Sequence, residues 1–443
     1  MVQTAMKGFS ETFRDQWRSS GSFRLWTTLA AIGLVFNLLL TILWQMEIIT
    51  FEDNPPANDL QIYLAAGSRF LQREDLYIAP RADFGLYAYS PAFAMVVGFL
   101  TFLPYKLIWV VDAFFHIIIY WALYWRWFHI FRRQRLNTAA DTMILLFPLW
   151  LIFTGLLYEI AYMNIYIFMA FIATLLLEAM LYQQTAKAIL WLAVLLPIKP
   201  QWAFALGIPF LLGQWHFLVK VTAGALLAYF AILAAMVLVT GQYALQQYHE
   251  YVQFLQSIPY TFVWNTLGKD GHIGYNNSIM QLIVFFTNSA PYRVGLTTAI
   301  KILLTLPLIV VYGRYRLNSP GDVTPAFTLE WAFALYLLAF LWLDVVTELT
   351  FGIVIFAYLL GVLSKQSAKN WARLFFLPYA LTFLWVTVSG VMSFFVSLPG
   401  LIIDPSLFVP FIFIAMLGFY SLVLWQLSDR LKDQITKTVH ELG

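Results

Sequence analysis

The chain has 443 residues, of which 61% are hydrophobic and only 11% are charged. Soluble domains carry roughly 25% charged residues, so this composition indicates a polytopic membrane protein. The net charge of +3 is too small to indicate a nucleic-acid partner, and the absence of cysteine excludes disulfides, thiolate nucleophiles and cysteine-ligated metals.

The first 24 residues are polar and mix acidic with basic side chains. This is typical of a cytoplasmic interfacial helix and not of a cleavable signal peptide. An apolar run over 25–45 follows and is the first predicted membrane span. We therefore divide the chain into an interfacial segment, 1–24, and a single polytopic membrane domain, 25–443.

Two long segments, 48–106 and 240–294, are predicted to face outward and to enclose a cavity. In the first, Asp59 begins a short amphipathic helix of the kind that lies on a membrane surface. The apolar run 87–103 is interrupted by Pro91 and is too short for an upright span. In the second segment, apolar residues recur at helical spacing around a glycine-rich polar stretch that contains His272.

The predicted fold is an all-α integral membrane protein with about twelve transmembrane helices. The runs 187–199 and 201–215 are short and are divided at Lys199-Pro200, so they form either two spans or one bent helix. The count of twelve places the run Arg132-Arg133-Gln134-Arg135 and both termini in the cytoplasm, as the positive-inside rule requires. After 25–45, the spans are expected at 107–127, 139–157, 164–182, 187–199, 201–215, 217–239, 295–313, 326–344, 349–363, 373–395 and 406–427.

Several short motifs resemble those of glycosyltransferase family 87, the polyprenyl-phosphate-mannose-dependent mannosyltransferases of the C-type superfamily. Its N-terminal signature is similar to Asp59-x-x-x-Tyr63-x-x-Ala66, Asp75-Leu76-Tyr77, Tyr87-x-Tyr89-x-Pro91 and Leu103-Pro104. Two later elements are similar to Lys199-Pro200-Gln201 and to Asn276-Asn277-Ser278 with Gln281. The chain departs from the family at Ala161-Tyr162-Met163-Asn164, which keeps only the Asn of a Gly-Gln-x-Asn element, and over 343–348, where relatives often have Ser-Pro-x-x-Trp.

The resemblance implies a C-type glycosyltransferase architecture with interfacial helices in the first outward loop. It also implies transfer of a hexose, by resemblance mannose, from a polyprenyl-phosphate-sugar donor to a lipid-linked or glycan hydroxyl acceptor. The reaction would take place at the outer face of the cell membrane, among membrane lipids, and would invert the anomeric carbon. The chain shows no glycine-rich phosphate loop, so we expect neither a nucleotide nor another cofactor.

Asp59 is the predicted catalytic residue, because attack by an acceptor hydroxyl needs a general base and a carboxylate can supply one. The competing interpretation is a helix N-cap, in which the side chain of Asn58 or Asp59 accepts a backbone N–H. The residues alone favour the cap, whereas the family resemblance favours the base.

A cation within an apolar run is costly without a partner, so Lys199 either binds the donor phosphate or extends to the membrane interface. Arg69 and His272 are the other candidates for the donor phosphate. The i, i+4 pair Asp344 and Glu348 lacks a third ligand, and we predict no metal site. For Glu159 and Asn164, hydrogen bonding to sugar hydroxyls and a polar contact between helices are equally open. The candidate substrate-binding residues are Tyr63, Tyr89, Glu159, Asn164, Gln201, Asn276, Asn277 and Gln281.

Two other functional classes remain open from the sequence. A lipid or sugar transporter or flippase would also use charged groups within the membrane, although no internal repeat typical of transporters is visible. A catalytically inactive relative could serve as a scaffold in envelope assembly. Neither alternative needs a base at Asp59.

Overall fold

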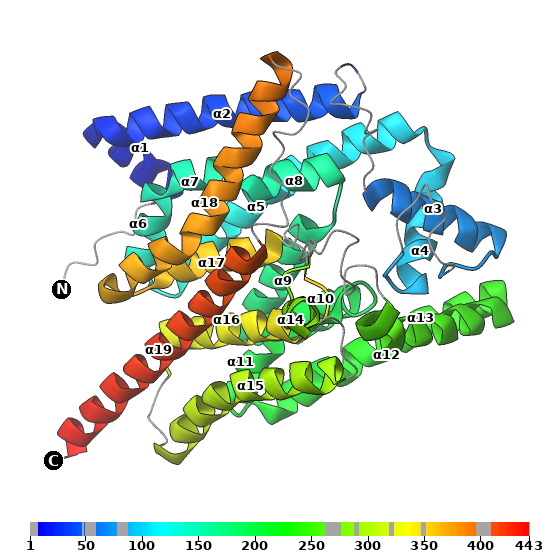
Figure 1. Ribbon diagram of the computed structural model, residues 1–443. Coiled ribbons are helices and arrows are strands. Elements are labelled where there is room, and N and C mark those ends of the chain that lie inside the picture. Colours follow the sequence, from blue (N-terminus) through cyan, green and yellow to red (C-terminus); the bar gives the residue numbers. More distant parts are fainter. Residues whose placement is uncertain are drawn as a thin grey trace.

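The computed structural model describes residues 8–46, 48, 59–77, 87–261, 276–287, 292–318, 323–346, 351–395 and 409–442. Within these ranges the chain forms helices and no sheet (Figure 1), which confirms the predicted all-α class. His272, Glu348 and the glycine-rich stretch around His272 lie outside the described residues.

The helices follow one another with short connections in most of the described chain. In order they are α1 (Phe9–Ser19), α2 (Gly21–Gln45), α3 (Asp59–Gln72), α4 (Pro91–Gly98), η1 (Phe99–Phe102), α5 (Tyr105–Arg133), α6 (Asn137–Leu145), α7 (Phe147–Leu151), α8 (Thr154–Tyr162), α9 (Tyr166–Leu181), α10 (Thr185–Leu195), η2 (Pro200–Leu206), α11 (Gly207–Leu211), α12 (Trp215–Thr240), α13 (Gln242–Thr261), α14 (Ile279–Thr287), α15 (Arg293–Asn318), α16 (Pro325–Trp342), α17 (Phe351–Leu363), α18 (Gln366–Phe395) and α19 (Val409–Leu442).

Six helices of the described chain are long and apolar enough to cross a membrane, which indicates a multi-pass membrane protein. They are α2, α5, α12, α15, α16 and the part of α19 over Phe411–Asp433. The predicted span 139–157 is instead divided among α6, α7 and α8, with Pro148 in the first turn of α7. The total of about twelve spans stays a prediction.

The two segments that are predicted to face outward contain the short helices that the sequence predicts. The amphipathic helix is α3, which begins at Asp59, and the run after Pro91 is α4 followed by η1. The chain also breaks at Lys199-Pro200, because α10 ends at Leu195 and Pro200 opens η2. Helices α13 and α14 supply the described part of the second segment.

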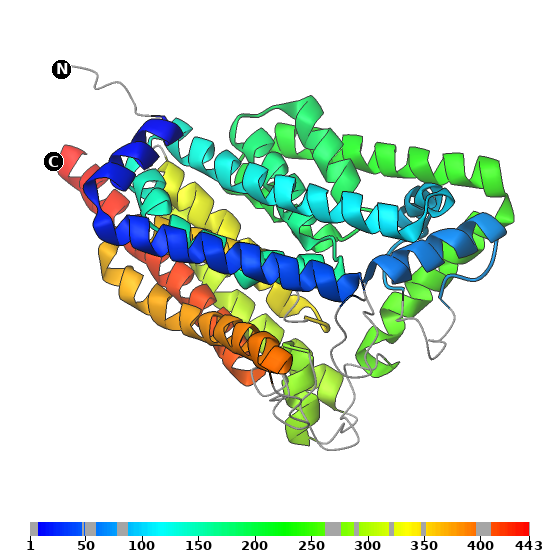
Figure 2. The ribbon, with the colours of Figure 1, turned by 90° about the horizontal axis from the view of Figure 1, so that it is seen from above.

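Both termini lie at one end of the helix bundle, and α3, α4 and α13 lie at the other (Figures 1 and 2). At the terminal end, Arg132 pairs with Asp141 at 2.6 Å and donates to the Thr12 hydroxyl of α1 at 3.3 Å. There too Lys365, before α18, pairs with Asp429 of α19 at 2.6 Å. Basic side chains predicted to be cytoplasmic therefore gather where the two termini lie, opposite the Asp59 helix.

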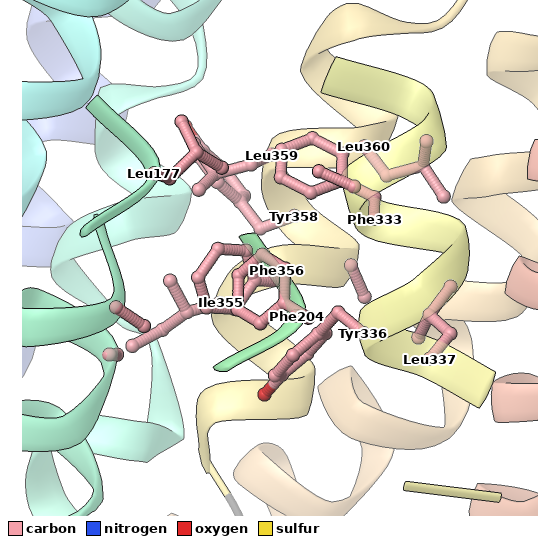
Figure 3. Close-up of a cluster of buried hydrophobic side chains, with 14 of the residues drawn as sticks. Leu177, Phe204, Phe333, Tyr336, Leu337, Ile355, Phe356, Tyr358, Leu359 and Leu360 are labelled. Atoms are coloured by element: carbon pink, nitrogen blue, oxygen red, sulfur yellow. The ribbon is translucent and has the colours of Figure 1, made fainter. Parts of the chain in front are cut away.

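An aromatic core surrounds η2, directly after the Lys199-Pro200 break. Phe204 of η2, Tyr336 of α16 and Phe356 of α17 meet there (Figure 3), with ring centroids 4.4 Å apart for Tyr336 and Phe356 and 4.8 Å apart for Phe204 and Tyr336. Trp202 is fully buried in the same core, 5.7 Å from the ring of Phe340. Large buried rings have few alternative packings, so they define where the backbone after Lys199 runs.

Helices α3 and α4 touch through two glycines. A Cβ atom on Gly67 would lie 2.7 Å from the backbone nitrogen of Gly98, and one on Gly98 would lie 3.1 Å from the carbonyl oxygen of Gly67. The backbones therefore approach more closely than any side chain would allow. This crossing holds α3 directly against α4.

We expect Gly67→Ala to lower the thermal unfolding temperature of the purified protein in detergent, because the new methyl group collides with backbone and not with a flexible side chain. Overpacking of this kind costs about 1–3 kcal/mol. Gly33→Ala in α2 is the matched control, since a Cβ atom there meets nothing within 4 Å, and it should be neutral or slightly stabilising. Equal stability of the two variants would contradict the close crossing.

Candidate functional site

The carboxylate of Asp59 meets a side-chain amide from a distant part of the chain. Asn164 Nδ2 donates a hydrogen bond to Asp59 Oδ2, although the two residues are 105 positions apart. Asn164 lies in the turn between α8 and α9, directly after Met163, whose φ of 50° is left-handed. The turn thus presents the Asn164 side chain to the first residue of α3.

Two tyrosines extend this contact. Tyr63 lies one turn after Asp59 on α3, and its hydroxyl donates to Asn164 Oδ1 at 3.2 Å. The Tyr63 and Tyr89 hydroxyl oxygens are 3.0 Å apart. A phenol has one hydrogen, and Tyr63 uses it on Asn164, so Tyr89 is the donor within the tyrosine pair. The amide of Asn164 is thereby oriented, with its nitrogen toward Asp59.

Lys199 joins the same group of side chains. Its ammonium donates to the Tyr166 hydroxyl at 2.6 Å and lies 4.2 Å and 4.9 Å from the ring centroids of Tyr166 and Tyr89. Aromatic faces and a hydroxyl stabilise a cation that has little access to water. We call Asp59, Tyr63, Tyr89, Asn164, Tyr166 and Lys199 the Asp59 cluster.

The electrostatic environment of Asp59 changes its acidity. Burial is the larger effect and raises the pKa of Asp59 to about 6, while the positive charge of Lys199 acts in the opposite direction. The carboxylate is therefore ionised at neutral pH and more basic than an exposed aspartate. A carboxylate of this kind suits general-base work.

Glu159 of α8, five residues before Asn164 in the chain, is fully buried. Its Oε2 accepts the backbone N–H of Ile167 at 3.2 Å and lies 3.8 Å from His116 Nε2. His116 and Tyr166 were not among the predicted site residues. The available signals were a histidine inside an apolar run and an aromatic residue two positions after Asn164.

The predicted residues Asn276, Asn277 and Gln281 form a separate buried group at the start of α14. Asn276 Nδ2 donates to the carbonyl oxygen of Asp344 at 2.8 Å, and its Oδ1 accepts the backbone N–H of Val346 at 2.8 Å. Asp344 in turn pairs with Lys301 at 2.6 Å. These contacts join α14, α15 and the end of α16 and give Asp344 a protein partner; a role in substrate binding stays a prediction.

Arg69 and Gln201 are not brought into the Asp59 cluster by any described side-chain hydrogen bond or ion pair. Arg69 is half-buried on α3, ten residues after Asp59, which is roughly 15 Å along a helix axis. Gln201 is half-buried in η2. In the part of the chain that the structure describes, no group of three or more His, Asp and Glu side chains could hold a metal ion.

The chain matches no protein-family model, no curated protein and no solved structure. The resemblance to glycosyltransferase family 87 therefore rests on the short motifs alone. What the structure adds is geometric, since it brings six of the predicted residues, Asp59, Tyr63, Tyr89, Glu159, Asn164 and Lys199, to one end of the bundle.

We expect Lys199→Met to raise the pKa of Asp59 above about 6, because the nearby cation that favours the ionised carboxylate is lost. The carboxylic-acid C=O band in infrared spectra recorded across pH 4–9 reports this pKa, and Asp59→Asn assigns the band. Lys106→Met, at an exposed lysine near the start of α5, should leave the band's titration unchanged. An unshifted titration in Lys199→Met would show that Lys199 does not act on Asp59.

Proposed function

We propose that this protein is a membrane glycosyltransferase that moves a hexose from a polyprenyl-phosphate sugar to a lipid-linked or glycan hydroxyl. The observation that carries the proposal is the Asp59 cluster, which contains both a carboxylate of raised pKa and a lysine. The cluster lies at the end of the bundle opposite the ion pairs of Arg132 and Lys365. The motif resemblance supplies the sugar class, with mannose as the first donor to test. On this proposal the Asp59 end faces outward.

Asp59 would act as the general base. Its Oδ2 already accepts from Asn164, which leaves Oδ1 to take the proton of the acceptor hydroxyl. As that proton leaves, the hydroxyl oxygen forms a bond to the anomeric carbon. The bond from the anomeric carbon to the phosphate oxygen breaks, and its electron pair departs with the phosphate. A single displacement of this kind inverts the anomeric carbon.

Lys199 would stabilise the departing phosphate. An ammonium has three hydrogens, and Tyr166 accepts one of them. The other two can bind phosphate oxygens, whose negative charge grows as the glycosidic bond breaks. Because the leaving group is an anion, cationic stabilisation replaces the general acid that an alkoxide leaving group would need.

Asp59→Asn should reduce turnover by about 10²- to 10⁴-fold, the usual contribution of a general base, while keeping the hydrogen bond from Asn164 possible. The assay uses purified protein in lipid nanodiscs, a radiolabelled polyprenyl-phosphate-mannose donor and a membrane lipid extract as acceptor. Asp75→Asn is the control, because Asp75 lies just beyond α3 and its carboxylate accepts the backbone N–H of Tyr77, outside the Asp59 cluster.

Full activity of Asp59→Asn would remove Asp59 as the base. Failure of the folded wild-type protein to move label from mannose, glucose or arabinose donors would overturn the transferase proposal and would favour a lipid transporter or a scaffold.

The pH profile gives a second test. Only the ionised form of Asp59 can accept a proton, so kcat/KM should rise about tenfold per pH unit below pH 6 and level off above it, following the pKa of about 6. Rates measured from pH 4.5 to 8 with saturating donor supply the profile. A plateau that extends below pH 5 is the result that would contradict a raised pKa at the catalytic base.

A further inference from the structure

His116 of α5 is fully buried, and both of its ring nitrogens face carbonyl oxygens. Nδ1 lies 2.8 Å from the backbone oxygen of Asp112, and Nε2 lies 2.6 Å from the backbone oxygen of Asn164. A carbonyl oxygen only accepts hydrogen bonds, so each nitrogen must be the donor. Hydrogen bonds at both positions therefore need a hydrogen on each ring nitrogen, which is the imidazolium form of the ring.

The groups around His116 fit a positive ring. Asp112 Oδ1, on the same helix, is 3.6 Å from Nδ1, and Glu159 Oε2, from α8, is 3.8 Å from Nε2. From α9 the ring of Phe168 packs edge to face at 4.7 Å. A buried cation is tolerated when it is paired and hydrogen-bonded. His116 has two carboxylates and two carbonyl acceptors, with Glu159 the more deeply buried of the two carboxylates.

His116 acts on the turn that carries Asn164. That turn contains a left-handed non-glycine residue, Met163, a backbone conformation that is strained for a residue with a Cβ atom. The His116 ring donates to the carbonyl oxygen of Asn164, while the backbone N–H of Asn164 donates to the carbonyl oxygen of Glu159 at 3.2 Å. The backbone of Asn164 is held on both sides, and its side chain is then directed to Asp59.

We propose that His116 is a positioning residue: a buried imidazolium, with Glu159 as its counter-ion, that holds the Asn164 turn and through it orients Asp59. Its charge state stands on the hydrogen-bond geometry alone. Its effect on turnover rests on the proposed transferase function, so the two are tested by separate measurements.

His129 is an internal control on the same helix. Its Nδ1 lies 2.8 Å from the backbone oxygen of Trp125, the same i, i+4 contact that His116 makes with Asp112, but its side chain is exposed. The two histidines therefore share one carbonyl contact and differ in the second contact and in the neighbouring carboxylates.

The charge state can be read directly by magic-angle-spinning NMR of the wild-type protein, labelled with ¹⁵N-histidine, in lipid bilayers at pH 7.5. We expect two protonated nitrogens for His116, each correlated to its own slowly exchanging hydrogen, with His116→Gln and His129→Gln assigning the two signals. A single protonated nitrogen on His116 would overturn the proposal. Glu159→Gln should remove the second hydrogen from His116, and its retention there would overturn Glu159 as the counter-ion.

The positioning role predicts a kinetic signature. His116→Gln keeps one donor but loses the charge, so kcat should fall roughly tenfold to a hundredfold, the equivalent of one charge-assisted hydrogen bond, with KM little changed. The acid limb of the kcat/KM profile should also move to higher pH, because a cation near Asp59 is lost. His129→Gln should change neither quantity, and an unshifted limb in His116→Gln would refute the role.

These outcomes separate the two proposals. If the folded wild-type protein moves no label, the transferase proposal and the kinetic test of His116 fail together, whereas the NMR result on the wild-type protein decides the charge state of His116 independently.

Discussion

The hydrogen bond between Asn164 and Asp59 is the contact on which the rest of the candidate site depends. It joins the short helix α3 to the turn between α8 and α9, two pieces of chain separated by 105 positions. Tyr63 fixes which way the amide points, since it donates to Asn164 Oδ1. The Asn164 nitrogen therefore faces Asp59, and one oxygen of the Asp59 carboxylate is hydrogen-bonded within the protein.

In a protein this apolar, most side chains have little contact with water. Charged groups are stable there only where solvent, an opposite charge or a hydrogen-bonding group is close. The protein meets this constraint at its two ends. At one end Arg132 and Lys365 pair with acidic side chains near both termini. At the other, Lys199 is held by a hydroxyl and two aromatic rings, and Asp59 by an amide. Burial of Asp59 at this end raises the pKa of its carboxyl group.

Short sequence patterns predict the helices and helix breaks that depend only on residues within one or two turns. The amphipathic spacing after Asp59 predicts α3, and Pro200 predicts the break after α10, because periodicity and proline act within one or two turns. The same reasoning treats 139–157 as one span, whereas the chain divides there into three short helices. It also misses His116, since a histidine in an apolar run acquires a role only from Glu159 and Asn164, which lie on other segments.

The remaining hydrogen-bonding capacity of the Asp59 cluster argues for group transfer more than for transport. Tyr63 donates its hydroxyl hydrogen to Asn164, and Tyr166 accepts from Lys199. Among the described contacts, Asp59 Oδ1 and two hydrogens of the Lys199 ammonium are left to meet a ligand. Asp59 Oδ1 can accept a proton, and the Lys199 ammonium can donate hydrogen bonds to an anion. A transport site needs only affinity, but displacement of a phosphate by a hydroxyl needs this pair of opposite functions on the two sides of one anomeric carbon.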